Sequence, residues 1–204
     1  MNSLVLDNLG YEPPNIVADT IGNLNVVWNG SSYQVWHDNE LWLVHNPSSL
    51  QTVMEFYSHY SLAEGYVLCT GLGLGIRENW LIRKPEVTKL TCVEINKEII
   101  DYHYRHNPQL MERIEVIHAD ANEYIGECDT LLIDHYENES WEEKLDMVEK
   151  CSSNIRHNRL WFWCIESMLT EIPYSDLRQR FPTLPDLSRN RIEHFLTMYF
   201  NTTP

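Results

Sequence analysis

The sequence predicts an α/β fold: a doubly wound, mostly parallel sheet with a small N-terminal antiparallel β-hairpin or meander. Three observations lead to this prediction. Five short apolar runs alternate with segments of helical periodicity between residues 66 and 167, as in repeated strand–helix units. The first run opens into a glycine-rich turn followed by a helical segment. The other four runs end at the carboxylates Glu94, Asp120, Asp134 and Glu166.

Length and composition limit the classes of protein that fit. The 204 residues suit one domain with a small appendage, and a hydrophobic fraction of 43% is enough for a buried core. The formal net charge is −15 without a cluster of lysine and arginine, which argues against nucleic acid and anionic membranes as partners. No apolar run approaches the ~20 residues of a membrane span, and the N-terminus lacks a signal-peptide pattern, so we expect a cytoplasmic protein.

The cysteines indicate reduced thiols. Their number, five, is odd, and three of them lie in apparent core strands. The sequence has no C-x-x-C motif and no His/Cys cluster at zinc-ligand spacing, so we expect no metal site.

The chain divides into an N-terminal arm with a β-meander, residues 1–45, and a main domain, residues 46–204. Residues 1–23 contain Pro13-Pro14 and predict an irregular arm. Apolar residues alternate from 24 to 45, and the turn dipeptides Asn29-Gly30 and Asp38-Asn39 interrupt the alternation. Asn46 and Pro47 then suit an N-cap and the first position of a helix.

The glycine-rich turn follows a predicted strand over residues 66–70 and precedes a predicted helix over 76–84, which Pro85 ends. Gly71, Gly73 and Gly75 allow a ligand to approach the backbone closely, and the helix start offers free N–H groups to an anionic or nucleotide-like ligand. A dinucleotide fingerprint needs a glycine at position 76, which is isoleucine here.

The remaining elements continue the alternation. Strands are expected at residues 87–93, 114–117, 130–133 and 160–165. Helices are expected from Asn96, over residues 121–125 and from Ser140. Residues 174–181 predict a helix, and residues 191–199 either a helix or a last strand. Ligands in such sheets bind at the carboxyl ends of the strands, where the strand order reverses.

Taken together, the motifs resemble the class I S-adenosylmethionine-dependent methyltransferases, and most of all their spermidine-synthase branch. The resemblance runs from about residue 66 to 167 and rests on Val-Leu-Cys-Thr-Gly-Leu-Gly-Leu-Gly, Thr-Cys-Val-Glu-Ile-Asn, His-Ala-Asp-Ala, Leu-Leu-Ile-Asp-His-Tyr-Glu and Ile-Glu-Ser, in this order. It implies a Rossmann-like sheet and S-adenosylmethionine as the cofactor.

The resemblance also implies a set of cofactor-binding residues. Glu94 would accept hydrogen bonds from both ribose hydroxyls, Asp120 would accept one from the adenine amino group, and the N–H of Ala121 would bond the ring. Glu94 and Asp120 are alternatively helix caps or solvated surface. The full set is Gly71, Leu72, Gly73, Gly75, Glu94, Ile95, Asp120, Ala121 and Asp134.

The loop after the fourth strand carries the predicted catalytic residues Asp134, His135, Tyr136 and Glu137. Asp134 or His135 would accept the proton of an amine or hydroxyl acceptor. Tyr136 would stack on the acceptor or hydrogen-bond to it, and Glu137 would help to orient it. An equally good interpretation of His135 is a solvent-facing loop histidine.

Departures from the spermidine-synthase pattern leave three hypotheses open. That branch has an aspartate for the amino end of its decarboxylated donor where this chain has Leu74, and its loop proline is absent. The first hypothesis is methyl transfer to a small-molecule acceptor. The alternatives are a spermidine-synthase-like aminopropyltransferase, which Asp134 with Glu137 favours, and a non-catalytic nucleotide-binding auxiliary subunit. A homodimer is a further expectation.

Overall fold

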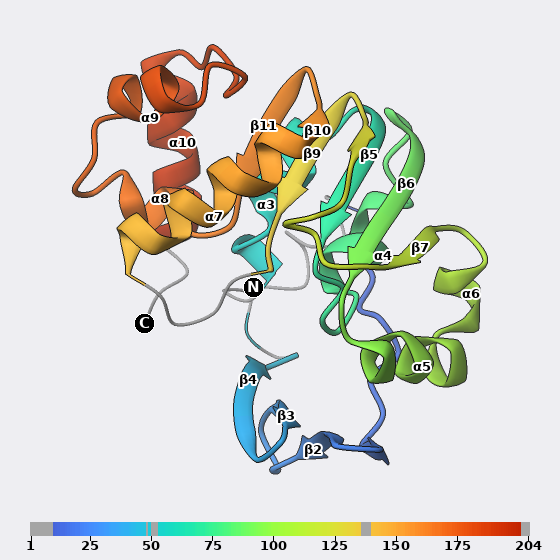
Figure 1. The fold of residues 1–204 in the computed structure, drawn as a ribbon. Helices are drawn as coiled ribbons and strands as arrows, with labels where there is room; N and C mark the ends of the chain where they lie inside the picture. The colour runs from blue at the N-terminus through green and yellow to red at the C-terminus, as the bar shows by residue number, and fades with distance from the viewer. Residues whose placement is uncertain (1–9, 48, 50–52, 136–139, 201–204) are drawn as a thin grey trace.

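The computed structural model describes residues 10–47, 49, 53–135 and 140–200. Its centre is a five-stranded sheet in the order β11-β9-β5-β6-β7, with every neighbouring pair parallel (Figure 1). The chain moves outward from β5 to β6 and β7, and then returns to the other side of β5 with β9 and β11. The order therefore reverses between β5 and β9, which confirms the predicted doubly wound sheet. The strands are β5 (Gly65–Thr70), β6 (Val87–Glu94), β7 (Glu115–His118), β9 (Thr130–Ile133) and β11 (Arg159–Phe162).

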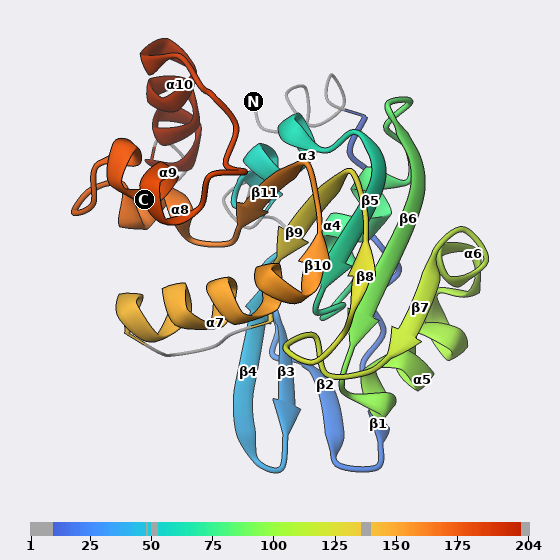
Figure 2. The same ribbon diagram turned by 45° about the horizontal axis from the view of Figure 1, so that its top comes forward.

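Helices cover both faces of this sheet, so its central strands β5 and β9 are mostly apolar. Helices α4 (Ile76–Leu81) and α5 (Lys97–His106) follow β5 and β6 on one face, and α7 (Trp141–Asn154) crosses the other (Figure 2). The described side chains of β9 are buried along its whole length. Asn96 caps α5 by accepting from two backbone N–H groups, and Ser140 caps α7 in a capping box, as the sequence predicts for both helix starts.

The N-terminal sheet is antiparallel in the order β1-β2-β3-β4 and lies beyond the carboxyl ends of the parallel strands (Figures 1 and 2). Asp38 and Asn39 both have positive φ in the turn between β3 and β4, as a tight hairpin requires. The meander is confirmed, but the arm is not irregular throughout, because β1, which lies within residues 1–23, pairs with β2. The strands are β1 (Asp19–Ile21), β2 (Leu24–Trp28), β3 (Tyr33–His37) and β4 (Glu40–His45).

Two predicted elements of the main domain are wrong in detail. Residues 121–125 form a turn rather than a helix, because the carbonyl of Asp120 accepts from Glu123 and Tyr124 and the chain then extends into β8 (Gly126–Glu127). This short strand pairs with β10 (Ile155–Arg156). The fifth main strand ends at Phe162 instead of residue 165, since Cys164 has φ 63° and α8 (Ile165–Met168) begins directly after it.

Helices complete the described chain at its carboxyl end. Residues 174–180 form α9 (Tyr174–Arg180), and α10 (Arg189–Phe200) settles the open choice at residues 191–199 in favour of a helix. Phe195 of α10 packs edge-on against Tyr57 and Trp161. Tyr57 begins α3 (Tyr57–Leu62). At the predicted helix start, Pro47 lies in a turn in which the carbonyl of Asn46 accepts from the N–H of Ser49 at 2.9 Å, and residues 48 and 50–52 lie outside the described residues.

Two further expectations concern cysteines and membranes. All five cysteines are buried and unpaired. In the described ranges no helix is long and apolar enough to cross a membrane.

Candidate functional site

The glycine turn after β5 adopts a backbone that only glycine accommodates easily. Gly71, Gly73 and Gly75 have φ values of 74°, 49° and 70°. A Cβ atom at Gly71 would overlap the carbonyl oxygen of Asp134, and one at Gly75 would lie 2.9 Å from the ring of His103. The turn therefore packs against the end of β9 and against helix α5, at the position where the strand order reverses.

Glu94 at the end of β6 is tied to this turn. Its Oε2 accepts from the N–H of Leu72 at 2.6 Å, and its Oε1 accepts from the N–H of Asn96 at 2.7 Å. The residue is only 7% exposed, and burial raises the pKa of its carboxyl group. Each oxygen keeps a second lone pair, so two donor hydroxyls could bond to the same carboxylate.

The residues that the resemblance assigns to the adenine lie at the neighbouring strand ends. The N–H of Ala119 after β7 donates to the carbonyl of Glu94 at 3.1 Å, which joins the ends of β7 and β6. Asp120 is half-buried and accepts from the N–H of Asn122 at 2.8 Å through Oδ1. Ala121 is buried, whereas Ile95 is 63% exposed and offers an apolar surface next to Glu94.

His135 is half-buried, and both of its ring nitrogens have partners. Nδ1 lies 2.6 Å from the hydroxyl of Thr70, and Nε2 lies 3.2 Å from Oδ1 of Asn122. The same hydroxyl accepts from the N–H of Asp134 at 3.1 Å, so its own proton is free to donate to Nδ1. This arrangement favours the tautomer with hydrogen on Nε2, and it does not match a solvent-facing loop histidine.

Asp134 lies at the end of β9 with a side chain that is 24% exposed. Burial raises the pKa of its carboxyl group to about 6, with Arg77 opposing the rise and Glu78 and Glu94 adding to it. At neutral pH the group is mostly ionised, yet it takes up a proton more readily than an ordinary aspartate. Such a group suits the role of a general base.

Two charged residues near Asp134 were not predicted from the sequence as part of the site. Arg77 is 3% exposed on α4, and Lys144 is 6% exposed on α7. The Lys144 ammonium lies 5.2 Å and 5.4 Å from the ring centres of Trp141 and Trp163. The only sequence signal for Arg77 is its charge, two residues after the apolar glycine turn.

A half-buried glutamate, Glu55, and a buried one, Glu166, complete this neighbourhood. Burial raises the pKa of Glu55 and of Glu166 to about 7, and the charge of Asp134 adds to the rise at Glu55. Glu166 lies on α8 and is 3% exposed, so it is not an open strand-end carboxylate. Its partners belong to other segments, which a sequence pattern cannot show.

The other residues of interest fall outside this group. Leu74 is 2% exposed in the hydrophobic core, so its side chain does not line an open cleft. Tyr136 and Glu137 lie outside the described residues. Within the described ranges, no group of three or more His, Cys, Asp or Glu side chains is arranged to hold a metal ion.

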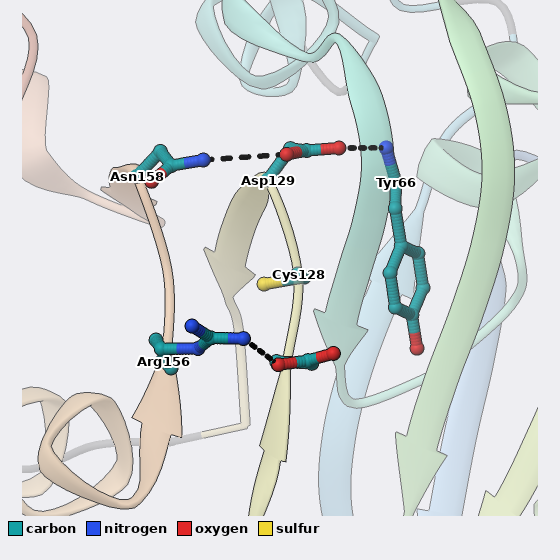
Figure 3. A pocket seen from close by; sticks show the side chains of 6 residues that line it. Tyr66, Cys128, Asp129, Arg156 and Asn158 are labelled. Atoms are coloured by element: carbon teal, nitrogen blue, oxygen red, sulfur yellow. Dashed lines mark hydrogen bonds and ion pairs between the residues drawn. The ribbon is translucent and has the colours of Figure 1, made fainter.

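A cavity of about 350 Å³ lies at the other end of the strands (Figure 3). Asp129 there accepts from the N–H of Tyr66 at 2.8 Å and from Asn158 at 3.3 Å, and Arg156 pairs with Glu127. Because Tyr66 and Asp129 lie where β5 and β9 begin, this cavity is separate from the glycine turn. Its lining consists of Tyr66, Glu127, Cys128, Asp129, Arg156 and Asn158.

Solved structures with a similar fold include spermidine synthase from Thermotoga maritima, which is 15% identical with a TM-score of 0.49 over 72% of this chain and 54% of that one. A putative RNA methyltransferase from Pyrococcus horikoshii is 17% identical with a TM-score of 0.40 over 53% of each chain. The S-adenosylmethionine-dependent methyltransferase SibL is 17% identical with a TM-score of 0.45 over 74% of this chain and 48% of that one.

These proteins have the S-adenosylmethionine-dependent methyltransferase fold, with spermidine synthase among them, as the sequence predicts. The chain spans about half the length of each of the three. No family model and no curated protein matches the sequence. The likeness concerns the fold alone, so the chemistry has to be argued from this chain's own residues.

Proposed function

We propose that this chain binds S-adenosylmethionine and transfers its methyl group to a small-molecule acceptor. One observation carries the proposal. The carboxylate of Glu94 accepts from the N–H of Leu72 within the glycine turn, beside the point where the strand order reverses. Ligands of doubly wound sheets bind at this point, and a carboxylate there suits the two hydroxyls of a ribose.

The flanking residues suit the rest of an adenosine. Ile95 offers an exposed apolar side chain for one face of the base. Asp120, joined to the same strand end through Ala119, provides an acceptor for an exocyclic amino group. The glycine turn lets a ligand approach the backbone closely.

Asp134 is the residue that best suits proton removal from the acceptor. S-Adenosylmethionine supplies an electrophilic methyl group, and the protein has to orient the acceptor and take up its proton. A carboxyl group with a pKa of about 6 is ionised at neutral pH and can accept that proton. His135 is already bonded to Thr70 and Asn122, so we assign it to holding this loop rather than to the proton transfer. Tyr136 and Glu137 stay proposed acceptor contacts.

The aminopropyltransferase alternative has one observation in its favour. Glu55, Asp134 and Glu166 carry carboxyl groups close enough for charges to act between them, and such a group of acids suits an amine. Against it, Leu74 puts an uncharged and buried side chain where that branch has an aspartate for its donor. We therefore rank methyl transfer first.

Calorimetry with a panel of ligands tests the proposal: S-adenosylmethionine, S-adenosylhomocysteine, the decarboxylated donor and NAD. We expect binding of the first two and no binding of NAD, because the turn lacks the third dinucleotide glycine. Absence of heat with both sulfur nucleotides, for a folded sample, contradicts the proposal. Preference for the decarboxylated donor, together with turnover of putrescine, would favour the aminopropyltransferase. Binding of a sulfur nucleotide without turnover of any acceptor would favour the auxiliary subunit.

A further inference from the structure

Arg77 lies beneath the glycine turn as the second residue of α4, and it is 3% exposed. Its Nη2 donates to the carbonyl oxygens of Thr70 at 3.2 Å and of Gly71 at 2.7 Å. Nη2 and Nε also donate to Oε1 of Glu78, at 2.5 Å and 2.8 Å. One guanidinium group therefore holds the backbone where β5 passes into the glycine turn.

The same guanidinium faces the end of β9. Its Nη1 lies 3.5 Å from Oδ2 of Asp134, which is the distance of an ion pair but too long for a hydrogen bond. Nη1 is buried and has no hydrogen-bond partner in the part of the chain that the structure describes. The two strands that Arg77 contacts, β5 and β9, are those between which the strand order reverses.

We propose that Arg77 is a positioning residue of this site, which holds the glycine turn and the Asp134 carboxylate in a fixed relation to each other. The donor-binding turn and the group that receives the acceptor's proton would then be held by one side chain. The inference rests on the proposed function and adds to it a residue that touches neither ligand.

Stability alone gives a poor reason for an arginine at this position. A cation in the first turn of a helix opposes the helix dipole. A buried ion pair such as Arg77–Glu78 is often no more stabilising than apolar side chains of the same size. The fork geometry of the guanidinium, however, lets it contact two carbonyl oxygens and two carboxylates at the same time. Neither a lysine nor an apolar side chain can make all of these contacts.

Asp134 faces charged and titratable groups from several elements. Arg77 and Lys144 favour its ionised form, whereas Glu78 and Glu94 disfavour it. Loss of Arg77 would leave Lys144 as the cation among these groups, and loss of Glu78 would act in the opposite direction. The other groups that interact electrostatically with Asp134 are Glu55, Cys69 and Cys164.

Two substitutions that should shift the titration midpoint of Asp134 in opposite directions test the proposal. We would follow the carboxyl titration of Asp134 by ¹³C NMR in Arg77→Met and Glu78→Gln, and the affinity for S-adenosylhomocysteine in Arg77→Met. In Arg77→Met the titration midpoint should rise above that of the wild type, and affinity should fall about tenfold as the turn loses charge-assisted bonds. In Glu78→Gln the midpoint should fall.

Arg83→Met is the matched control, because Arg83 hydrogen-bonds to Asn79 and pairs with Glu12 away from Asp134. It should change neither quantity. A folded Arg77→Met protein with the titration and affinity of the wild type overturns the proposal. If Arg77→Met does not fold, Arg77→Lys replaces it: the charge stays but the fork is lost, so affinity should still fall, and wild-type affinity there overturns the proposal.

The titration separates this inference from the proposed function. If the wild type binds no sulfur nucleotide, the proposed function fails, yet the opposite shifts of the Asp134 midpoint still decide whether Arg77 controls that carboxylate. Equal midpoints in the wild type, Arg77→Met and Glu78→Gln would overturn the positioning role itself.

Discussion

At the scale of single residues, the hydrogen bonds of His135 indicate a structural role rather than the predicted catalytic one. The Thr70 hydroxyl accepts from Asp134 N–H and so donates to the histidine, whose second nitrogen faces Asn122. Thr70 ends β5, and Asn122 follows β7. His135 thus joins the end of β5 to the turn that follows β7, and Asp134 remains the better candidate for the proposed base.

Burial of Glu166 leads to a prediction about stability and pH. Its pKa is raised from 4.5 to about 7, so the folded state binds more protons than the unfolded state between these values. Stability from this group is therefore fully present below pH 4.5 and is lost as pH rises to about 7. We expect Glu166→Gln to gain stability relative to the wild type over this window, by up to about 3 kcal/mol at pH 8.

Urea unfolding of both proteins at pH 5 and pH 8 measures this difference. Glu171→Gln, an exposed position six residues beyond the start of α8, is the control and should show no such dependence on pH. A difference between wild type and Glu166→Gln that is the same at both pH values would mean that folding does not raise the pKa of Glu166.

At the scale of elements, the sequence predicts well wherever local pattern decides the structure. The apolar run of β9, the caps at Asn96 and Ser140 and the glycine turn all depend on neighbours within a few residues. It fails where distant contacts decide. Residues 121–123 form a turn, after which the chain pairs with β10 through β8, and the last main strand ends before Cys164, whose φ is positive.

The glycine turn allows a matched pair of substitutions. Gly71 and Gly30 both have positive φ, at 74° and 98°, but only at Gly71 would a Cβ atom meet a neighbouring backbone. Gly71→Ala should therefore lose about 1–3 kcal/mol more stability than Gly30→Ala, and it should also lose nucleotide affinity.

Urea unfolding and calorimetry check this pair. Equal losses in the two variants would mean that backbone strain alone, and not the close approach of β5 to the end of β9, accounts for the glycine at position 71.

At the scale of the whole molecule, the N-terminal sheet is attached to the site-forming edge of the main sheet. Asp19 pairs with Arg105 and His106 of α5, and Glu98 of α5 accepts from the N–H of Asn23. Leu43 of β4 lies over the glycine turn, 3.6 Å from the position that a Cβ atom of Gly73 would occupy. The N-terminal sheet therefore lies against the glycine turn, and we propose that it bounds the ligand site on this side.

The site itself was predictable only in part. Parallel strands bring their carboxyl ends to one edge, so Glu94, Asp120 and Asp134 could be placed there from the sequence. The partners that adjust Asp134 could not, because Arg77 lies 3.5 Å from it on α4 and Glu55, which comes from another segment, interacts with it electrostatically. Local periodicity carries no information about such contacts.

The central claim is that Glu94 and the glycine turn bind the nucleoside of S-adenosylmethionine. Titration calorimetry of S-adenosylhomocysteine into the wild type and Glu94→Gln tests it most directly, with Glu127→Gln at the far end of the strands as the control. The account predicts binding to the wild type and the control, and affinity at least about tenfold weaker in Glu94→Gln, because charge-assisted bonds to the ribose are lost. Equal affinity in all three proteins, or no binding to the wild type, would contradict it.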